Sequence, residues 1–188
     1  MTRRLGSATW DLLPWLTLAL VLLAGCNHRP RAPALQDEPV YLNAQEGFRF
    51  LVPTGWKQSA RSILPPGPVQ KERMLVEYKP PPAETAASLQ VTCIDLPSGT
   101  SPESYLSTRR HGTEPWRQKG AVEPLDVNGE SAVRLILTSR TGKEQLTREV
   151  VVFRRGDRAY FFTGLFPASD GKTREQVRQA VESVQWKG

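Results

Sequence analysis

Residues 149–164 read EVVVFRRGDRAYFFTG and contain a strand–turn–strand pattern. Two apolar runs, Glu149–Phe153 and Arg158–Gly164, flank the sequence Arg155-Gly156-Asp157. Branched and aromatic residues favour strands, and glycine beside aspartate favours a tight turn. The stretch therefore predicts an antiparallel hairpin. The letters RGD also suggest an integrin-binding motif, but a turn between two apolar strands accounts for them here.

A second hairpin is predicted at Asn128-Gly129, which lies between the apolar runs 125–127 and 131–137. Asn-Gly is the strongest short-range signal for a two-residue hairpin turn. Alternating apolar residues predict three further strands, bounded by proline and glycine. These strands are Phe48–Val52, Met74–Tyr78 and Leu89–Leu96.

Two helices are predicted. Ser101-Pro102-Glu103 has an N-cap residue, a proline at the first helical position and an acid in the first turn, so a helix is expected from there to about Arg110. A closing amphipathic helix is expected over Lys172–Gln185, with Asp170 as its N-cap. Its apolar stripe consists of Val177, Ala180, Val181 and Val184.

Together these elements predict a single α+β domain over residues 41–188. Tight hairpins join several of the strands, so the sheet is expected to be mainly antiparallel, with six or seven strands. Two helices are expected to cover it, because an exposed apolar sheet face must be buried.

The order of these segments resembles the Mog1/PsbP-like α/β/α sandwich. The resemblance rests on Phe48–Trp56 (FRFLVPTGW), on Arg158–Phe162 and on a closing helix that reaches Trp186. Members of that group include the oxygen-evolving-complex subunit PsbP, a Ran-binding nuclear factor and many uncharacterised bacterial lipoproteins. The matching motifs are structural, so the resemblance implies a fold and carries over neither photosystem binding nor GTPase binding.

The first 25 residues have the features of a secretory signal peptide. Arg3 and Arg4 give a positive start, and the apolar stretch Leu12–Leu23 leads to Leu23-Ala24-Gly25-Cys26. This stretch is shorter than the roughly 20 apolar residues that a membrane span needs. The letters LAGC resemble the lipobox of bacterial lipoproteins.

The lipobox resemblance implies cleavage before Cys26, a thioether-linked diacylglycerol on its sulfur and acylation of the new amino group, for example by palmitate. Two or more acyl chains make such an anchor stable. The Pro-rich residues 26–40 then form a lipidated tether. Localisation is expected in the cell envelope, outside the cytoplasm. Asn27, where an aspartate would favour the inner membrane, favours the outer membrane.

Composition restricts the partners and the chemistry. The formal net charge is +6, but the positive residues form no dense run, so no nucleic-acid partner is expected. Cys93 is the only cysteine besides Cys26. No internal disulfide is therefore expected, and Cys93 is predicted to be a small buried residue of a strand.

The sequence shows no catalytic constellation, so the chain is predicted not to be an enzyme. It has two histidines, His28 in the tether and His111 at a helix end, and neither has partners at metal-ligand spacing. It also lacks a glycine-rich phosphate loop and a Gly-x-Ser-x-Gly motif. No cofactor and no metal are expected.

The candidate interaction residues are tryptophans and arginines, the residue types favoured at binding hot spots. They are Trp56, Trp116, Arg109, Arg110 and Arg117. Burial of both tryptophans at the ends of the core is the preferred interpretation, because tryptophan is usually well buried.

Two functions remain open from the sequence. The first is a non-catalytic protein-interaction or assembly-stabilising module that is held at a membrane by its lipid and binds an envelope protein partner. The alternative is a small-ligand carrier or sensor with an apolar pocket between sheet and helix. That alternative predicts a closed cavity lined by residues such as Tyr160, Phe162 and Trp56.

Overall fold

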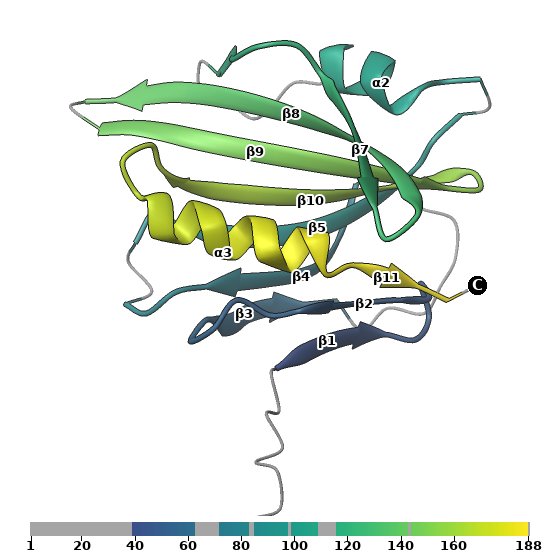
Figure 1. Ribbon diagram of the computed structural model, residues 1–188, viewed down its shortest axis with the longest axis horizontal. Coiled ribbons are helices and arrows are strands. Elements are labelled where there is room, and N and C mark those ends of the chain that lie inside the picture. The colour runs from purple at the N-terminus through teal and green to yellow at the C-terminus, as the bar shows by residue number, and fades with distance from the viewer. Residues whose placement is uncertain are drawn as a thin grey trace, which may run out of the picture. The chain divides into compact units, whose positions relative to one another are not determined.

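The computed structural model of the chain describes residues 39–62, 72–82, 85–97, 99–108, 116–142 and 144–187 (Figure 1). The predicted signal peptide, Cys26 and most of the tether lie outside these residues. The first strand begins at Val40, where the tether was predicted to end. No helix in the described ranges has the length and apolar character that a membrane span requires.

Eight antiparallel strands form the large sheet, in the order β3-β4-β5-β10-β9-β8-β6, with β7 paired to β8 beside that path. The long central strands are the ones that the sequence predicted most clearly. The bounds are β3 Lys57–Arg61, β4 Arg73–Lys79, β5 Ser88–Asp95, β6 Arg117–Gln118, β7 Glu123–Val127, β8 Glu130–Thr141, β9 Glu144–Arg155 and β10 Arg158–Pro167.

A second sheet of three strands contains β1 (Val40–Asn43), β2 (Phe48–Leu51) and β11 (Gln185–Trp186) in the order β1-β2-β11. The predicted antiparallel arrangement is confirmed, but the prediction of one six- or seven-stranded sheet is wrong. Strand β3 is polar and β6 and β11 have two residues each, so none of them carries a readable alternation. Strand β11 exists only because the chain end pairs with β2, far away in sequence.

Both predicted hairpins are confirmed. Asn128 and Gly129 have φ angles of 53° and 83°, the left-handed values that a type I′ turn requires, and they join β7 to β8. Gly156, with a φ of 61°, and Asp157 join β9 to β10. The register of this second hairpin places Tyr160 opposite Phe153.

Both faces of the large sheet are covered, because its central strands are apolar on both sides. Phe153 and Phe162 face α3 (Gly171–Glu182) and the small sheet, and they belong to the larger of two core clusters. Val152 and Phe161 face the other way, into the smaller cluster that contains Leu106 of α2 (Pro102–Thr108). In Figure 1, α3 lies in front of β10 and β5. Helix α2 lies at the top of the view, above β8.

Helix α3 begins where predicted. The Asp170 carboxylate accepts a hydrogen bond from the Thr173 amide at 3.0 Å, as an N-cap does. Val177 faces Gly164 of β10 so closely that a Cβ on Gly164 would lie 2.5 Å from the Val177 Cγ1. The missing side chain thus lets the helix approach the sheet.

The predicted end of α3 at Gln185 is wrong, since the helix stops at Glu182. The Ser183 hydroxyl donates to the Ala180 carbonyl at 2.7 Å and accepts the Leu51 amide of β2 at 2.8 Å. The chain then continues as β11, in which Trp186 pairs with Phe48.

Helix α2 is short and begins as predicted, with the Ser101 hydroxyl accepting the Ser104 amide at 3.1 Å. Its predicted extension to Arg110 lies outside the described residues. Of the two helices expected to cover the sheet, only α3 is long, so the domain is mainly an antiparallel β protein.

Candidate functional site

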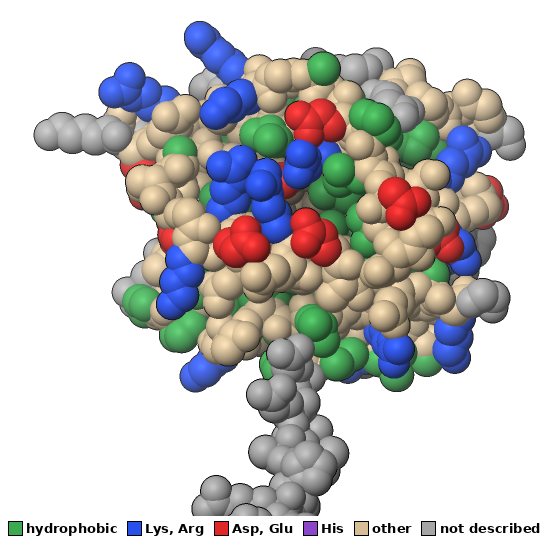
Figure 2. Space-filling model, in the orientation of Figure 1, with side chains coloured by type: hydrophobic (Ala, Val, Ile, Leu, Met, Phe, Trp, Pro, Cys, Tyr) green, Lys and Arg blue, Asp and Glu red, His purple; other side chains and the backbone are tan. Residues whose placement is uncertain are grey.

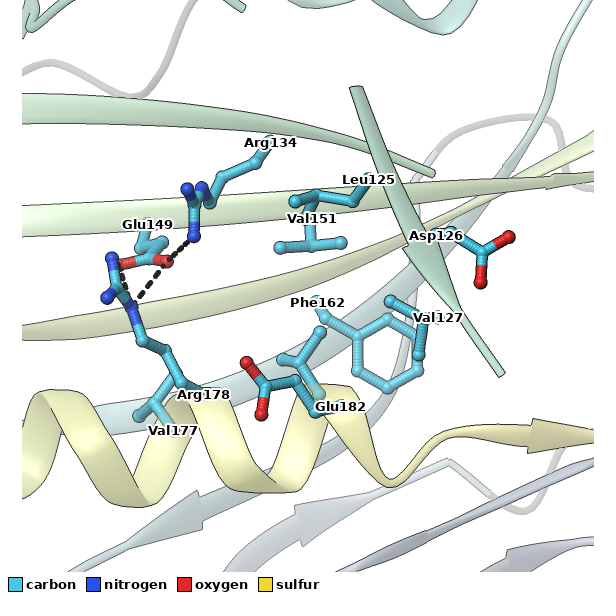
Figure 3. Close-up of a pocket in the computed structure, with 11 residues that line it drawn as sticks. Leu125, Asp126, Val127, Arg134, Glu149, Val151, Phe162, Val177, Arg178 and Glu182 are labelled. Atoms are coloured by element: carbon cyan, nitrogen blue, oxygen red, sulfur yellow. Dashed lines mark hydrogen bonds and ion pairs between the residues drawn. The ribbon is translucent and has the colours of Figure 1, made fainter. Parts of the chain in front are cut away.

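A pocket of about 80 Å³ lies between α3 and the large sheet, next to strand β7 of that sheet (Figure 3). Six apolar side chains and five charged ones line it, and they come from β7, β8, β9, β10 and α3. The apolar ones are Leu125, Val127, Val151, Phe162, Val177 and Val181; the charged ones are Asp126, Arg134, Glu149, Arg178 and Glu182.

Glu149 is the most deeply placed charge of the pocket, with a side chain only 3% exposed. It lies on β9, and strand alternation puts it on the same face as Val151 and Phe153, towards α3. The Arg178 Nε of α3 donates to the two Glu149 oxygens, at 3.1 and 3.3 Å. Burial of this carboxylate is tolerable because a guanidinium compensates it directly.

Two more arginines surround Glu149. The Arg134 Nη1 lies 3.6 Å from one of its oxygens, and the Arg174 Nε lies 3.9 Å from the other. Arg174 and Arg178 are four residues apart on α3, so both reach the same face of the helix. Figure 3 shows Arg134 and Arg178 converging on Glu149 at one end of the pocket.

Arg134 is held in turn by Glu123, its cross-strand neighbour on β7. The Arg134 Nη2 donates to a Glu123 oxygen at 2.5 Å and its Nε to the same oxygen at 3.1 Å. This hydrogen bond and the charge of Arg134 lower the pKa of the exposed Glu123 carboxyl. Arg134 and Arg178 are therefore each oriented by a carboxylate.

The other rim of the pocket is acidic. Asp126 and Glu182 line it, and neither carboxylate forms an ion pair with any side chain that the structure describes. Figure 2 shows the resulting pattern on this face: a group of basic side chains, acidic side chains around it and an apolar hollow beside it. The five charges that line the pocket leave an excess of one negative charge at neutral pH.

The Glu149 carboxylate is already engaged within the domain. Both of its oxygens accept hydrogen bonds from the Arg178 guanidinium. Within the described ranges, no group of three or more His, Cys, Asp or Glu side chains could hold a metal ion. Both histidines of the chain lie outside those ranges.

The structure places Trp56 in the larger core cluster, where it is 7% exposed. Its indole nitrogen donates to the Gln176 Oε1 of α3 at 3.2 Å, so the ring joins the turn after β2 to the closing helix. A side chain so deeply buried offers no surface to a partner.

Trp116 lies on the other face of the large sheet, half-buried against the smaller core cluster. The Arg148 guanidinium covers its ring, 4.3 Å from the centroid. Arg117 is exposed on β6. Trp116 and Trp56 therefore do not form one surface. Cys26, Arg109 and Arg110 lie outside the described residues.

The cavity expected for a ligand carrier is present only in part. The observed pocket includes Phe162 but neither Tyr160 nor Trp56. Tyr160 packs edge-to-face against Trp186 with ring centroids 4.8 Å apart, and aromatic side chains fill the space expected to be hollow. Sequence reasoning missed Glu149, although an acid at an inward position of an apolar strand was a usable signal. Cys93 is buried, as predicted.

No family model matches this sequence, and no curated protein matches it either. Solved structures do match. The solution structure of cyanobacterial PsbP (CyanoP) from Synechocystis sp. has a TM-score of 0.56 and 15% identity, covering 79% of this chain and 91% of that one. A crystal structure from Bacteroides thetaiotaomicron has a TM-score of 0.50 and 7% identity, covering 79% and 48%. The chain is thus similar in fold to a PsbP-like protein.

Proposed function

We propose that this chain is a lipid-anchored protein of the bacterial cell envelope whose domain is a non-catalytic protein-interaction or assembly-stabilising module. Cys26 carries the lipid in this proposal, and the domain works outside the cytoplasm, at the outer membrane in preference to the inner. Three features support it: the LAGC sequence, the PsbP-like fold and the pocket beside α3.

The observation that carries the proposal is the size and composition of that pocket. A space of about 80 Å³ is small beside the several hundred Å³ of typical small-molecule sites. It matches one apolar side chain of a partner. Binding hot spots have this form: an anchor residue enters a dry pocket, and a polar rim excludes water around it.

The rim also indicates the chemistry of the partner. Arg134 and Arg178 are neutralised by Glu123 and Glu149, whereas Glu182 and Asp126 have no described counter-ion. The unbalanced charge at the mouth is negative. We therefore expect the partner's apolar anchor to be accompanied by a lysine or arginine, because complementary charge fixes orientation and speeds association.

Affinity purification of the tagged, lipidated protein from gently solubilised membranes tests the proposal. A reproducible stoichiometric partner is expected. Leu125→Ala removes a half-buried wall of the pocket and should weaken that partner's affinity about tenfold, the equivalent of roughly 1.4 kcal/mol.

Leu146→Ala is the matched control, because Leu146 is also half-buried on the large sheet but does not line the pocket. It should leave the affinity unchanged. Equal losses in both variants, or a partner that binds the Leu125→Ala protein normally, would remove the pocket from the proposal.

A small-ligand carrier remains a second candidate, because the pocket does lie between sheet and helix as that function requires. Only a ligand of a few heavy atoms would fit. Native mass spectrometry of protein purified from its membrane would reveal such a ligand as a discrete added mass, and this mass should decrease in the Leu125→Ala variant.

A further inference from the structure

The large apolar side chains that the described residues leave exposed all lie on the small sheet. Val40 is 52% exposed, Leu42 54% and Leu51 38%. Val40 pairs with Leu51 across β1 and β2, and Leu42 is the next residue to project from the same face of β1. They form one outward-facing group, which we call the apolar strip.

One basic side chain flanks the apolar strip. Arg49 is the cross-strand partner of Leu42, and the neutral Gln185 side chain holds it there through hydrogen bonds of 2.9 and 2.6 Å. Figure 1 places β1 at the lower edge of the domain. Along that edge in Figure 2, hydrophobic (green) and basic (blue) side chains are visible, and the acidic (red) side chains lie higher.

The strip also lies directly after the tether. Residues 27–39 separate Cys26 from Val40, a span of roughly 50 Å at most at about 3.5 Å per fully extended residue. Any shorter conformation of this segment brings Val40 closer to the lipid on Cys26. Val40 and Leu42 thus lie on the first described strand after Cys26.

We propose that the apolar strip rests on the membrane surface, with Val40, Leu42 and Leu51 in the headgroup region and Arg49 on anionic headgroups. The proposal rests on the lipid anchoring of Cys26 proposed above. Apolar and basic side chains on one face are the combination by which peripheral proteins bind anionic membranes. The anchor makes even weak contact effective, because it raises the local concentration of the strip at the surface.

The depth of insertion follows from the backbone. Strand β1 is the edge of its sheet among the described residues. The hydrogen bond of 2.7 Å from the Val52 amide to the Pro39 carbonyl sets the register, so the amides and carbonyls of Val40 and Leu42 point away from β2. Such groups need water, which is absent from the hydrocarbon core. The strip therefore lies at the headgroup level.

Fluorescence depth measurements on the lipidated protein test this proposal. The protein is reconstituted in vesicles of phosphatidylethanolamine and phosphatidylglycerol, and a single cysteine is introduced at Leu42 for an environment-sensitive dye. Cys26 would be blocked by its lipid and Cys93 is buried, so only the new thiol reacts. Gln145→Cys, on the exposed start of β9, is the matched label site.

The dye at position 42 should be quenched by nitroxide lipids labelled near the headgroup, and the dye at position 145 should be quenched only by soluble reagents. In sedimentation with the same vesicles, the unlipidated Cys26→Ser protein should bind in a salt-sensitive way. Leu42→Asp should reduce that partitioning about tenfold, because one apolar contact is lost and an acid is added. Gln145→Glu, which adds the same charge elsewhere, should not.

Quenching of the dye at position 42 by water-soluble reagents alone would overturn the proposal. So would shielding of that dye without vesicles in proportion to protein concentration, since a second copy would then cover β1. The lipid anchor is tested separately, by the mass of the wild-type chain. If Cys26 is not lipidated, that mass will lack the acyl groups, and this result does not depend on how the strip behaves in sedimentation.

Discussion

The carboxylate of Glu46 accepts a hydrogen bond from the Tyr160 hydroxyl at 2.8 Å, although the two residues lie 114 positions apart. Arg158 donates to the same oxygen at 2.8 Å, and Arg73 pairs with the other oxygen. The Glu46 side chain is 3% exposed. It comes from the turn between β1 and β2, so this cluster joins the small sheet to β4 and β10 of the large one.

Glu46→Gln should destabilise the domain by about 3 kcal/mol. The variant leaves two arginines beside a neutral amide in a poorly hydrated place, and breaking a buried ion pair on one side typically costs that much. Chemical denaturation monitored by tryptophan fluorescence measures the change. Glu130→Gln is the control, because the Glu130–Arg155 pair is about one-third exposed on both sides and should contribute less than about 1 kcal/mol. Similar losses in the two variants would contradict a special role for Glu46.

Alkaline pH should unfold the domain through its buried tyrosines. Burial, and to a smaller extent the nearby Tyr41, raises the pKa of Tyr78 to about 12. Burial also raises the pKa of Tyr160. A pKa that is higher in the folded state favours the protonated phenol. The stabilisation is therefore complete below the unfolded value of about 10 and is lost as the pH rises towards 12.

Tyr78→Phe isolates this effect, because within the described part of the chain the Tyr78 hydroxyl makes a single long contact, 3.5 Å to Gln58. Stability near pH 7 should change little. Between pH 10 and 12, the decline in unfolding free energy should be shallower by up to about 1.4 kcal/mol per pH unit, the contribution of one proton. An unchanged slope in denaturation series across this range would disprove the assignment to Tyr78.

Asp170→Ala should cost about 1 kcal/mol, the usual contribution of an N-cap side chain. Hydrogen bonds from Thr173 lower the pKa of the Asp170 carboxyl, so its charged form stabilises the fold above the unfolded pKa of about 3.9, and this is lost on further acidification. Asp170→Asn keeps a capping oxygen and should lose only this acid dependence. Thermal melts at pH 7 and pH 3 separate the two effects.

Gly164→Ala should destabilise the domain by about 1–3 kcal/mol, because the new methyl group would overlap Val177 of α3. Combining it with Val177→Ala should cost less than the sum of the single changes, since the smaller residue removes the overlap. A double-mutant cycle measures this coupling. Additive effects would show that α3 moves away instead of clashing.

The elements that the sequence predicted well depend on local chemistry. Asn128-Gly129 forms its turn because few other dipeptides adopt two left-handed residues, and Asp170 caps α3 through a contact three residues away. Helix ends were less predictable. Val184 continues the apolar stripe, yet the chain leaves the helix before it, because pairing of Trp186 with Phe48 competes with helical hydrogen bonds.

The candidate site was the least predictable part. Of the candidate interaction residues, Trp56 is in the larger core cluster and Trp116 lies on the opposite face of the sheet. Each indole ring buries its apolar surface against the core cluster next to it. The pocket instead depends on Glu149, Arg134 and Arg178, which come from β9, β8 and α3. Their spacing along the chain carries no signal of their contact.

Local features can be read from the sequence alone: the strand alternation, the two hairpin turns, the cap of α3 and the LAGC motif at Cys26. Each depends on residues within a few positions of one another, where backbone geometry and residue type are enough. Long-range contacts become visible in the folded chain: Glu46 joins two sheets, Glu149 lies beside an apolar pocket, and Val40, Leu42 and Leu51 stay exposed. Those outcomes depend on which distant strands pair, and the free energy of that choice is shared by the whole core.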